Sequence, residues 1–147
     1  ENDDVTNRIN AEINDLSFLF KQADFLNIDL IKKQENLNYT TADLESPIAD
    51  VKADICNLPF QDNSFDVVIA INTIHNLERN DCAKALREIE RVSSKGAFIT
   101  VDAYRNDEEK ERMFAWNLTA KTIMSVDEWV SFFEEVGYTG DYFWFMP

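Results

Sequence analysis

The fold of this chain is decided by one stretch, Ala53-Asp54-Ile55-Cys56-Asn57-Leu58-Pro59-Phe60-Gln61-Asp62-Asn63-Ser64-Phe65-Asp66-Val67-Val68-Ile69-Ala70. It opens with a short strand that ends in an acid, Asp54. A loop closed by Leu58-Pro59-Phe60 and an exposed turn follow. The apolar run from Val67 to Ile71 then predicts a strand that is covered on both faces.

Strand-like and helix-like segments alternate on both sides of this stretch. We expect strands near residues 37–42, 51–54, 66–71 and 97–102, with a last one near 141–146, and a first candidate at 17–20. Helices are expected at 4–15, 81–92, 106–117 and 126–136. Alternation of this kind means parallel pairing with right-handed crossovers. The sequence therefore predicts an α/β fold, a three-layer α/β/α sandwich with a Rossmann-like sheet.

Capping residues mark the ends of two of these helices. Asn80 or Asp81 is the expected cap of the helix at 81–92, and Gly96 is its expected stop. Ser125 with Glu128 has the spacing of a capping box at the start of the helix at 126–136. Gly137 is expected to end that helix.

Composition limits the class of protein. With 147 residues, 45% of them hydrophobic and 29% charged, the chain fits one globular domain covering residues 1–147. The formal net charge of −14 argues against a nucleic-acid partner, which needs a basic surface. No apolar run approaches the ~20 residues that span a bilayer, so no membrane partner is expected.

The two cysteines, Cys56 and Cys82, show no metal-binding spacing and give no disulfide framework. We therefore expect no metal site and a reducing, cytoplasmic location. The chain begins at Glu1 without a methionine, which suggests a processed or trimmed start.

Polar residues follow three of the expected strands. Asp43 ends one strand, Asp54 ends the next, and Asn72 follows the long apolar one. In open parallel sheets, ligands bind beyond the carboxyl ends of the strands. An acid there accepts hydrogen bonds from ribose hydroxyls or from an adenine amino group, and the backbone N–H of Ile55 offers a donor to the ring. Acids at strand ends also cap turns, but three polar residues at successive ends favour a nucleoside site.

The order of motifs resembles the class I S-adenosylmethionine (SAM) methyltransferases, specifically their small-molecule type 11 group. The resemblance runs from about Leu37 to Phe145 and rests on four segments. These are the Asp54 to Phe60 stretch, the Ser64 to Val68 strand entry, the helix Ala85 to Val92, and the late helix from Ser125 to Tyr138. The resemblance implies SAM as cofactor and methyl transfer as activity.

The resemblance also assigns roles to individual residues. It implies that Asp54 contacts the adenine of SAM. Asp43 is the leading candidate for the ribose acid, with Asp29 as its rival. Asp24 takes the position of an acid that binds the SAM ammonium.

One family signature is absent. The first loop of the family is glycine-rich, because glycine lets the backbone pass close under the methionine part of SAM. Here the corresponding loop is Lys21-Gln22-Ala23-Asp24, and no glycine precedes Gly96. Two alternatives follow: an adapted SAM site, or a catalytically inactive methyltransferase-like domain that serves as a binding or assembly partner. A NAD-dependent oxidoreductase is disfavoured, because no glycine fingerprint precedes an acid at the right spacing.

Candidate catalytic and substrate residues follow the later strands. His75, the one histidine, comes just after the strand at 66–71 and is the candidate base, although a lone histidine is more often structural. Tyr104 and Arg105 could orient a substrate, a small molecule such as a sugar or another metabolite. Trp116 could belong to a lid over that acceptor or to a core or dimer contact, so a homo-oligomer is compatible with the sequence.

Overall fold

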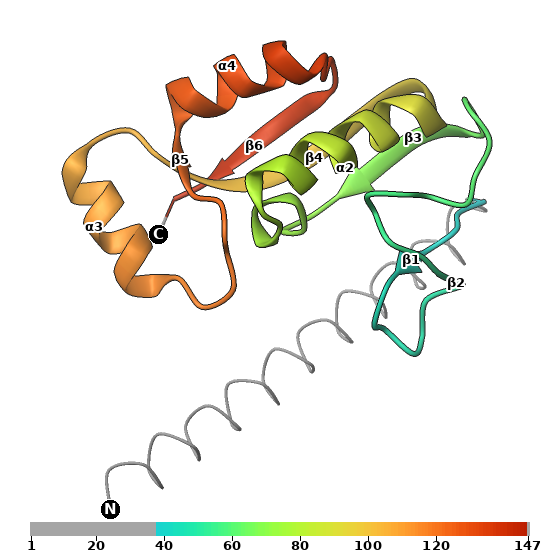
Figure 1. The fold of residues 1–147 in the computed structure, drawn as a ribbon, viewed down its shortest axis with the longest axis horizontal. Helices are drawn as coiled ribbons and strands as arrows, with labels where there is room; N and C mark the ends of the chain where they lie inside the picture. Colours follow the sequence, from blue (N-terminus) through green and yellow to red (C-terminus); the bar gives the residue numbers. More distant parts are fainter. Residues whose placement is uncertain (1–37, 147) are drawn as a thin grey trace, which may run out of the picture. The chain divides into compact units, whose positions relative to one another are not determined.

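The structure, a computed structural model, describes residues 38–146. Four of its strands form a parallel sheet. Its central strand β4 (Ser93–Tyr104) pairs in parallel with β3 (Phe65–Ala70), β5 (Met124–Ser125) and β6 (Asp141–Phe145). Residues from Ala42 onward form one compact unit, and Figure 1 shows β3, β4 and β6 side by side within it. The predicted Rossmann-like α/β fold, with its last strand beside the strand of residues 97–102, is confirmed.

Helices connect these strands. A 3-10 turn, η1 (Ile74–Asn76), and helix α2 (Arg79–Val92) lie between β3 and β4, while α3 (Asp107–Trp116) and α4 (Val126–Val136) follow β4. Every second residue of β4 is buried on one face, which places that face against helices. The resulting core cluster includes residues of β4, α2 and α4: Ala97, Ile99, Val101, Ala103, Leu86, Ile89, Trp129 and Phe133.

Both predicted ends of α4 are confirmed; for α2 the predicted last residue, Val92, is confirmed, but the predicted start and the stop at Gly96 are wrong. Ser125 and Glu128 form the capping box of α4, and Gly137 ends it in the left-handed region at φ 79°. Helix α2 begins at Arg79, because the Asp81 amide already bonds the carbonyl of Glu78. It ends at Val92, and the chain passes directly into β4, so Gly96 lies inside a strand and is not a helix stop.

Strand β3 is covered on one face by the described residues, whereas its apolar run predicted burial on both. Val67, Ile69 and Ile71 are 55%, 67% and 49% exposed. Val68 and Ala70, on the opposite face, pack into the core cluster. The difference arises because α2 and α4 contribute to that cluster and pack on the face of Val68 and Ala70.

The first two described strands form a sheet of their own. β1 (Ala42–Asp43) and β2 (Val51–Lys52) pair in parallel, with Asp43 opposite Lys52. We expected longer strands at 37–42 and 51–54 within the main sheet, and this is corrected: residues 38–41 are irregular and β1 begins only at Ala42. The expected helix at 4–15 and strand at 17–20 lie outside the described residues.

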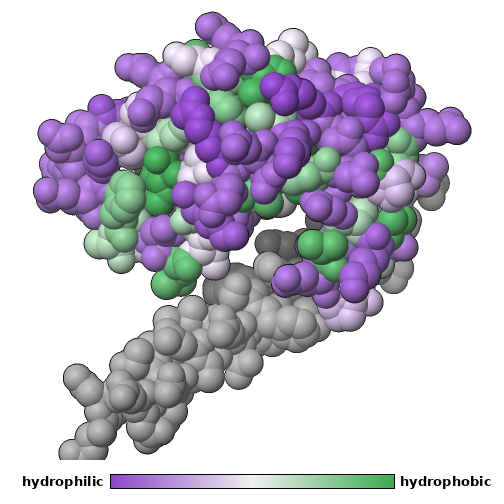
Figure 2. Space-filling view, viewed as in Figure 1, coloured by the Kyte–Doolittle hydropathy of each residue, from purple (hydrophilic) through white to green (hydrophobic). Residues whose placement is uncertain are grey.

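The surface of the described residues is largely hydrophilic on the face in view (Figure 2). Figure 2 shows hydrophilic residues over most of the face in view, with smaller apolar patches between them. Within residues 38–146, no helix is long and apolar enough to cross a membrane.

Candidate functional site

Asp43 lies at the carboxyl end of β1 and closes the loop that follows. Its Oδ1 accepts hydrogen bonds from the amides of Glu45 (2.8 Å) and Ser46 (2.7 Å). Its backbone carbonyl accepts the Ala53 amide at 3.1 Å, which joins the end of β1 to the residue after β2. Oδ1 thus fixes the loop, and Oδ2 accepts no hydrogen bond from the residues that the structure describes.

Asp54 has the same arrangement two residues beyond β2. Its Oδ1 accepts the amide of Cys56 at 2.8 Å, and its carbonyl accepts the amide of Asn57 at 2.9 Å. The side chain is exposed. Ile55, the residue between Asp54 and Cys56, is partly buried against the core cluster, and this contact anchors the turn. Because β1 and β2 are parallel neighbours, Asp43 and Asp54 lie at the same end of their two-stranded sheet.

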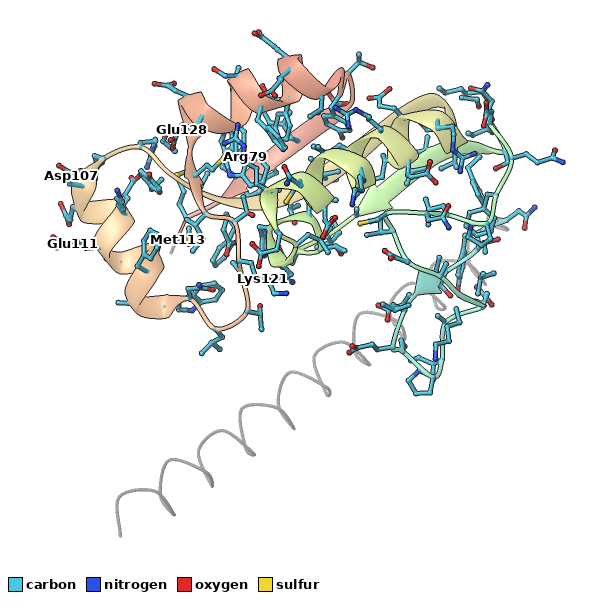
Figure 3. The ribbon with its side chains drawn as sticks, in the orientation of Figure 1. Arg79, Asp107, Glu111, Met113, Lys121 and Glu128 are labelled. Carbon is cyan, nitrogen blue, oxygen red and sulfur yellow. The ribbon has the colours of Figure 1, made fainter. Side chains whose placement is uncertain are left out.

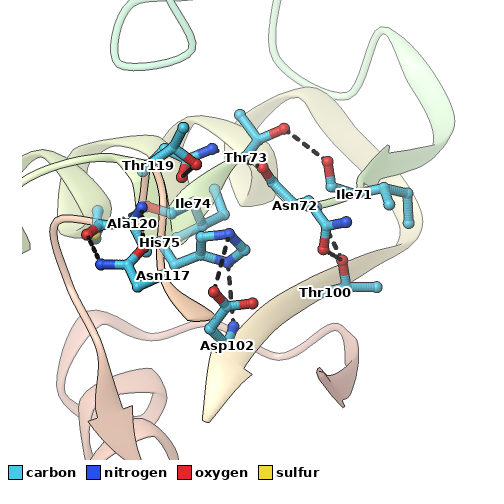
Figure 4. Close-up of polar contacts among 12 residues, drawn as sticks. Ile71, Asn72, Thr73, Ile74, His75, Thr100, Asp102, Asn117, Thr119 and Ala120 are labelled. Atoms are coloured by element: carbon cyan, nitrogen blue, oxygen red, sulfur yellow. Dashed lines mark hydrogen bonds and ion pairs between the residues drawn. The ribbon is translucent and has the colours of Figure 1, made fainter. Parts of the chain in front are cut away.

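Asn72 turns the chain after β3. Its φ of 51° lies in the left-handed region, which asparagine tolerates better than most residues. The Asn72 amide donates to Thr100 Oγ1 (2.8 Å), and the Thr100 hydroxyl donates to Asn72 Oδ1 (2.9 Å), as Figure 4 shows. The Asn72 carbonyl accepts the side-chain amide of Asn76 at 2.9 Å. The Asn72 side chain is thus held at the carboxyl end of β3, beside Thr100 in the middle of β4.

His75 is buried beside Asp102 of β4, at 4% and 3% exposure. The Asp102 amide donates to His75 Nδ1 (3.1 Å), and His75 Nε2 lies 3.7 Å from an Asp102 carboxylate oxygen (Figure 4). An acceptor at Nδ1 means that the proton of the neutral ring is on Nε2, facing the carboxylate. Burial lowers the pKa of His75 to about 4 and raises the pKa of Asp102 to about 6.

The neutral ring of His75 has no free lone pair in this arrangement. Its backbone carbonyl also accepts the amides of Lys121 (2.9 Å) and Thr122 (3.0 Å). His75 therefore joins η1 to β4 and to the segment before β5. The catalytic role of His75 stays a prediction, and these contacts support a structural one.

The candidate substrate residues lie around the end of β4 and on α3. Arg105 forms an ion pair with Glu109, a buried acid of α3, and its backbone amide also donates to Glu109 (2.8 Å). The Lys110 ammonium lies 5.3 Å from the centre of the Tyr104 ring. Trp116 is half-exposed, and its ring centre lies 4.9 Å from that of Phe145 on β6.

Helix α3 presents an acidic outer side. Figure 3 shows Asp107 and Glu111 pointing away from the rest of the unit and Met113 pointing toward it. Met113 is fully buried, which fixes the helix on its strand. Trp116 is the last residue of this helix.

The structure brings the predicted residues together in two groups. Asp43, Asp54 and Ile55 follow β1 and β2, while Asn72 and His75 follow β3, near Thr100 and Asp102. Asp24, the candidate for the SAM ammonium, and Asp29, the rival of Asp43 for the ribose, lie outside the described residues. Sequence reasoning missed Asp102, although its position after the apolar run of residues 97–101 was the same signal that identified Asp43 and Asp54.

An α/β unit with parallel strands and acids at their carboxyl ends belongs to the class of nucleotide- and cofactor-binding folds. Comparison with known families is more specific. A family model described as a methyltransferase domain matches residues 10–101, more than half of the 147-residue chain. The chain belongs to this family, the class I SAM-dependent methyltransferases.

Two relatives illustrate the similarity. An uncharacterized protein of Methanocaldococcus jannaschii is 43% identical over 63 residues, which are 42% of this chain and 27% of that protein. The 2-phytyl-1,4-naphtoquinone methyltransferase of Nostoc punctiforme is 32% identical over 92 residues, which are 62% of this chain and 39% of that enzyme. The matched part thus covers well under half of the length of either relative.

Proposed function

We propose that this chain binds SAM and transfers its methyl group to a small-molecule acceptor. The observation that carries the proposal is the pair Asp43 and Asp54, at the same end of two parallel strands and each with one carboxylate oxygen engaged in its own loop. Such fixed acceptors suit ribose hydroxyls and an adenine amino group, and the backbone N–H of Ile55 suits a ring nitrogen. This set of two carboxylate acceptors and one N–H donor fits the adenosine part of SAM.

SAM, when bound, supplies a methyl carbon activated by a positively charged sulfur. In this proposal Asp54 and Ile55 hold the adenine, Asp43 holds the ribose, and Asn72 borders the cofactor at the end of β3. Asp24 is proposed to hold the ammonium group. The protein's own contribution to the reaction is to orient the acceptor in line and to exclude water.

The acceptor is proposed to lie near Tyr104, Arg105 and Trp116. Arg105 donates to Glu109 from two guanidinium nitrogens, Nε and Nη2, which fixes its side chain. Arg105 is exposed and carries a charge suited to a carboxylate or phosphate. Trp116 offers an aromatic surface. The Nostoc relative is named as a methyltransferase of a naphthoquinone. That name supports a small organic acceptor for this chain as well.

A catalytically inactive binding domain is the second candidate. The absence of any glycine before Gly96 favours it, because bulky residues stand where the family has room for the methionine part of SAM. The two candidates differ in one property that can be measured directly, which is affinity for SAM.

Ligand-dependent thermal stability tests the proposal. SAM and S-adenosylhomocysteine should raise the melting temperature of the full chain, because a ligand that binds only the native state stabilises it. NAD should not. The shift should shrink strongly in Asp54→Ala and persist in Glu111→Ala, an acid on the outer side of α3. An equal shift in both variants would contradict the assignment of Asp54.

A further inference from the structure

Two charged residues of α2 hold the loop that follows Asp54. Glu88 Oε2 accepts the amide of Leu58 at 2.7 Å. Glu88 also receives Arg91 Nε on Oε1 (2.7 Å) and Arg91 Nη2 on Oε2 (2.8 Å), a two-pronged ion pair one helical turn apart. The remaining donors of Arg91 point into the loop.

Arg91 satisfies the carbonyls of that loop. Its Nη1 donates to the Phe60 carbonyl (2.7 Å) and to Asp62 Oδ1 (2.8 Å), and its Nη2 donates to the Leu58 carbonyl (3.1 Å). The Arg91 backbone carbonyl accepts the Asn63 amide at 2.8 Å. A loop without a ladder partner thereby gains fixed hydrogen bonds for its backbone groups, as buried or half-buried backbone requires.

The shape of the guanidinium is needed for this set of contacts. Arginine offers five donors in one plane, whereas the ammonium of lysine is a point charge that cannot reach two carbonyls and two carboxylates at once. The Glu88 and Arg91 side chains are 18% and 30% exposed, so the contacts are partly shielded from water. The hydrogen bond from Arg91 holds the pKa of Glu88 below its usual value, so Glu88 stays an acceptor at neutral pH.

The loop of residues 58–62, which Glu88 and Arg91 hold, directly follows the turn of residues 54–57, called here the Asp54 turn. Leu58, held by Glu88, is the next residue after Asn57, whose amide closes the turn on the Asp54 carbonyl. On the other side, the Cys56 thiol lies 3.5 Å from the Asp81 carbonyl at the start of α2. The turn of residues 54–57 is therefore attached to both ends of one helix.

We infer that Glu88 and Arg91 are positioning residues for the SAM site, which fix Asp54 and Ile55 through the loop of residues 58–62. This inference rests on the proposed function for its ligand. Neither residue touches the cofactor in this account. Their effect on SAM passes through the Asp54 turn alone.

A double-mutant cycle with SAM calorimetry on the full chain tests the inference. Arg91→Lys keeps the charge and should weaken SAM binding about five- to tenfold, and Glu88→Gln should act in the same direction. In an Asp54→Ala background, Arg91→Lys should weaken binding by a smaller factor, about two- to threefold, because only the Ile55 N–H remains of the two contacts through which it acts. Arg87→Lys, at an exposed position on the same helix, is the matched control and should leave the affinity unchanged.

Amide hydrogen exchange separates this inference from the proposed function. In Arg91→Lys, the amides of Cys56, Asn57 and Leu58 should exchange faster, whereas the buried amides of α4 should not. Unchanged exchange in the turn, or an equal loss of SAM affinity with and without Asp54, would overturn the inference. Absence of SAM binding by the parent would contradict the proposed function. The exchange rates would still show whether Glu88 and Arg91 order the turn of residues 54–57.

Discussion

The backbone amide of Asp102 donates a hydrogen bond of 3.1 Å to Nδ1 of His75, and the carboxylate of the same Asp102 lies 3.7 Å from Nε2 of that ring. One residue thus contacts both nitrogens of the one histidine. Trp129 of α4 donates its indole N–H to the Asp102 carbonyl at 2.9 Å, which ties the pair to the largest buried side chain of the core. The pair is built into the folded state, so its titration should be visible in stability.

The two groups should act on stability in opposite directions between about pH 4 and 6. His75 has a folded pKa of about 4, below its model-peptide value of 6.5, so the unfolded state binds more protons and stability falls as the pH drops from 6.5 to 4. Asp102 has a folded pKa of about 6, above its reference of 3.8, so stability rises as the pH drops through 6. In the parent, the two effects largely offset.

Replacing one residue of the pair should make the effect of the other measurable, as a change of about 1–3 kcal/mol in the free energy of unfolding between pH 6 and pH 4. In Asp102→Asn, the free energy of unfolding should decrease more steeply on acidification than in the parent. In His75→Gln, it should decrease less steeply or increase. Urea unfolding at a series of pH values measures both slopes, and parallel pH profiles for the parent and both variants would contradict the assigned pKa directions.

Gly140 should be sensitive to the smallest possible side chain. A Cβ at this position would lie 2.7 Å from the backbone oxygen of Ala97 and would also collide with the Tyr138 hydroxyl. Gly140→Ala should lower the free energy of unfolding by about 1–3 kcal/mol, because backbone atoms cannot yield as a side chain can. Gly96→Ala is the matched control, since a Cβ there meets nothing within 4 Å. Equal stability of the two variants in denaturant unfolding would contradict this packing.

The capping box of α4 should contribute measurably to stability. Ser125 Oγ accepts the Glu128 amide at 3.3 Å, and Glu128 Oε2 accepts the Ser125 amide at 2.8 Å. Ser125→Ala should cost about 0.5–2 kcal/mol, and Ser125→Asp should cost less because aspartate also caps helices. Ser131→Ala, an exposed position within the same helix, serves as the reference. A cost for Ser125→Ala no larger than that of Ser131→Ala would show that the box contributes nothing.

Local sequence signals predicted the structure well where a few neighbouring residues determine it. The start and end of α4 follow from Ser125, Glu128 and Gly137, which act on their own helix. The same reasoning failed for Gly96, because a glycine after a helix can equally lie in the next strand when the chain turns directly from α2 into β4. An apolar run likewise identified β3 without showing which of its faces the described helices cover.

The candidate site was predicted in part for the same reason. Acids after strands are visible in the sequence, and Asp43 and Asp54 do follow β1 and β2. The partners of the loop after Asp54 are not visible in the sequence, because Glu88 and Arg91 are about 30 residues away from that loop. The burial of His75 against Asp102 is also a tertiary contact, between residues 27 positions apart.

Titration of the full chain with SAM in a calorimeter measures whether the chain binds the proposed cofactor. We expect saturable binding at one site with a dissociation constant between about 1 μM and 1 mM, weaker than nanomolar because the glycine-free loop leaves less room for the methionine part. Asp54→Ala should weaken this binding by about five- to a hundredfold, the loss expected when a charged hydrogen-bond partner of the ligand is removed. No heat of binding at millimolar SAM would contradict the proposed methyl transfer, and the parallel α/β fold would then hold a binding domain without catalytic activity.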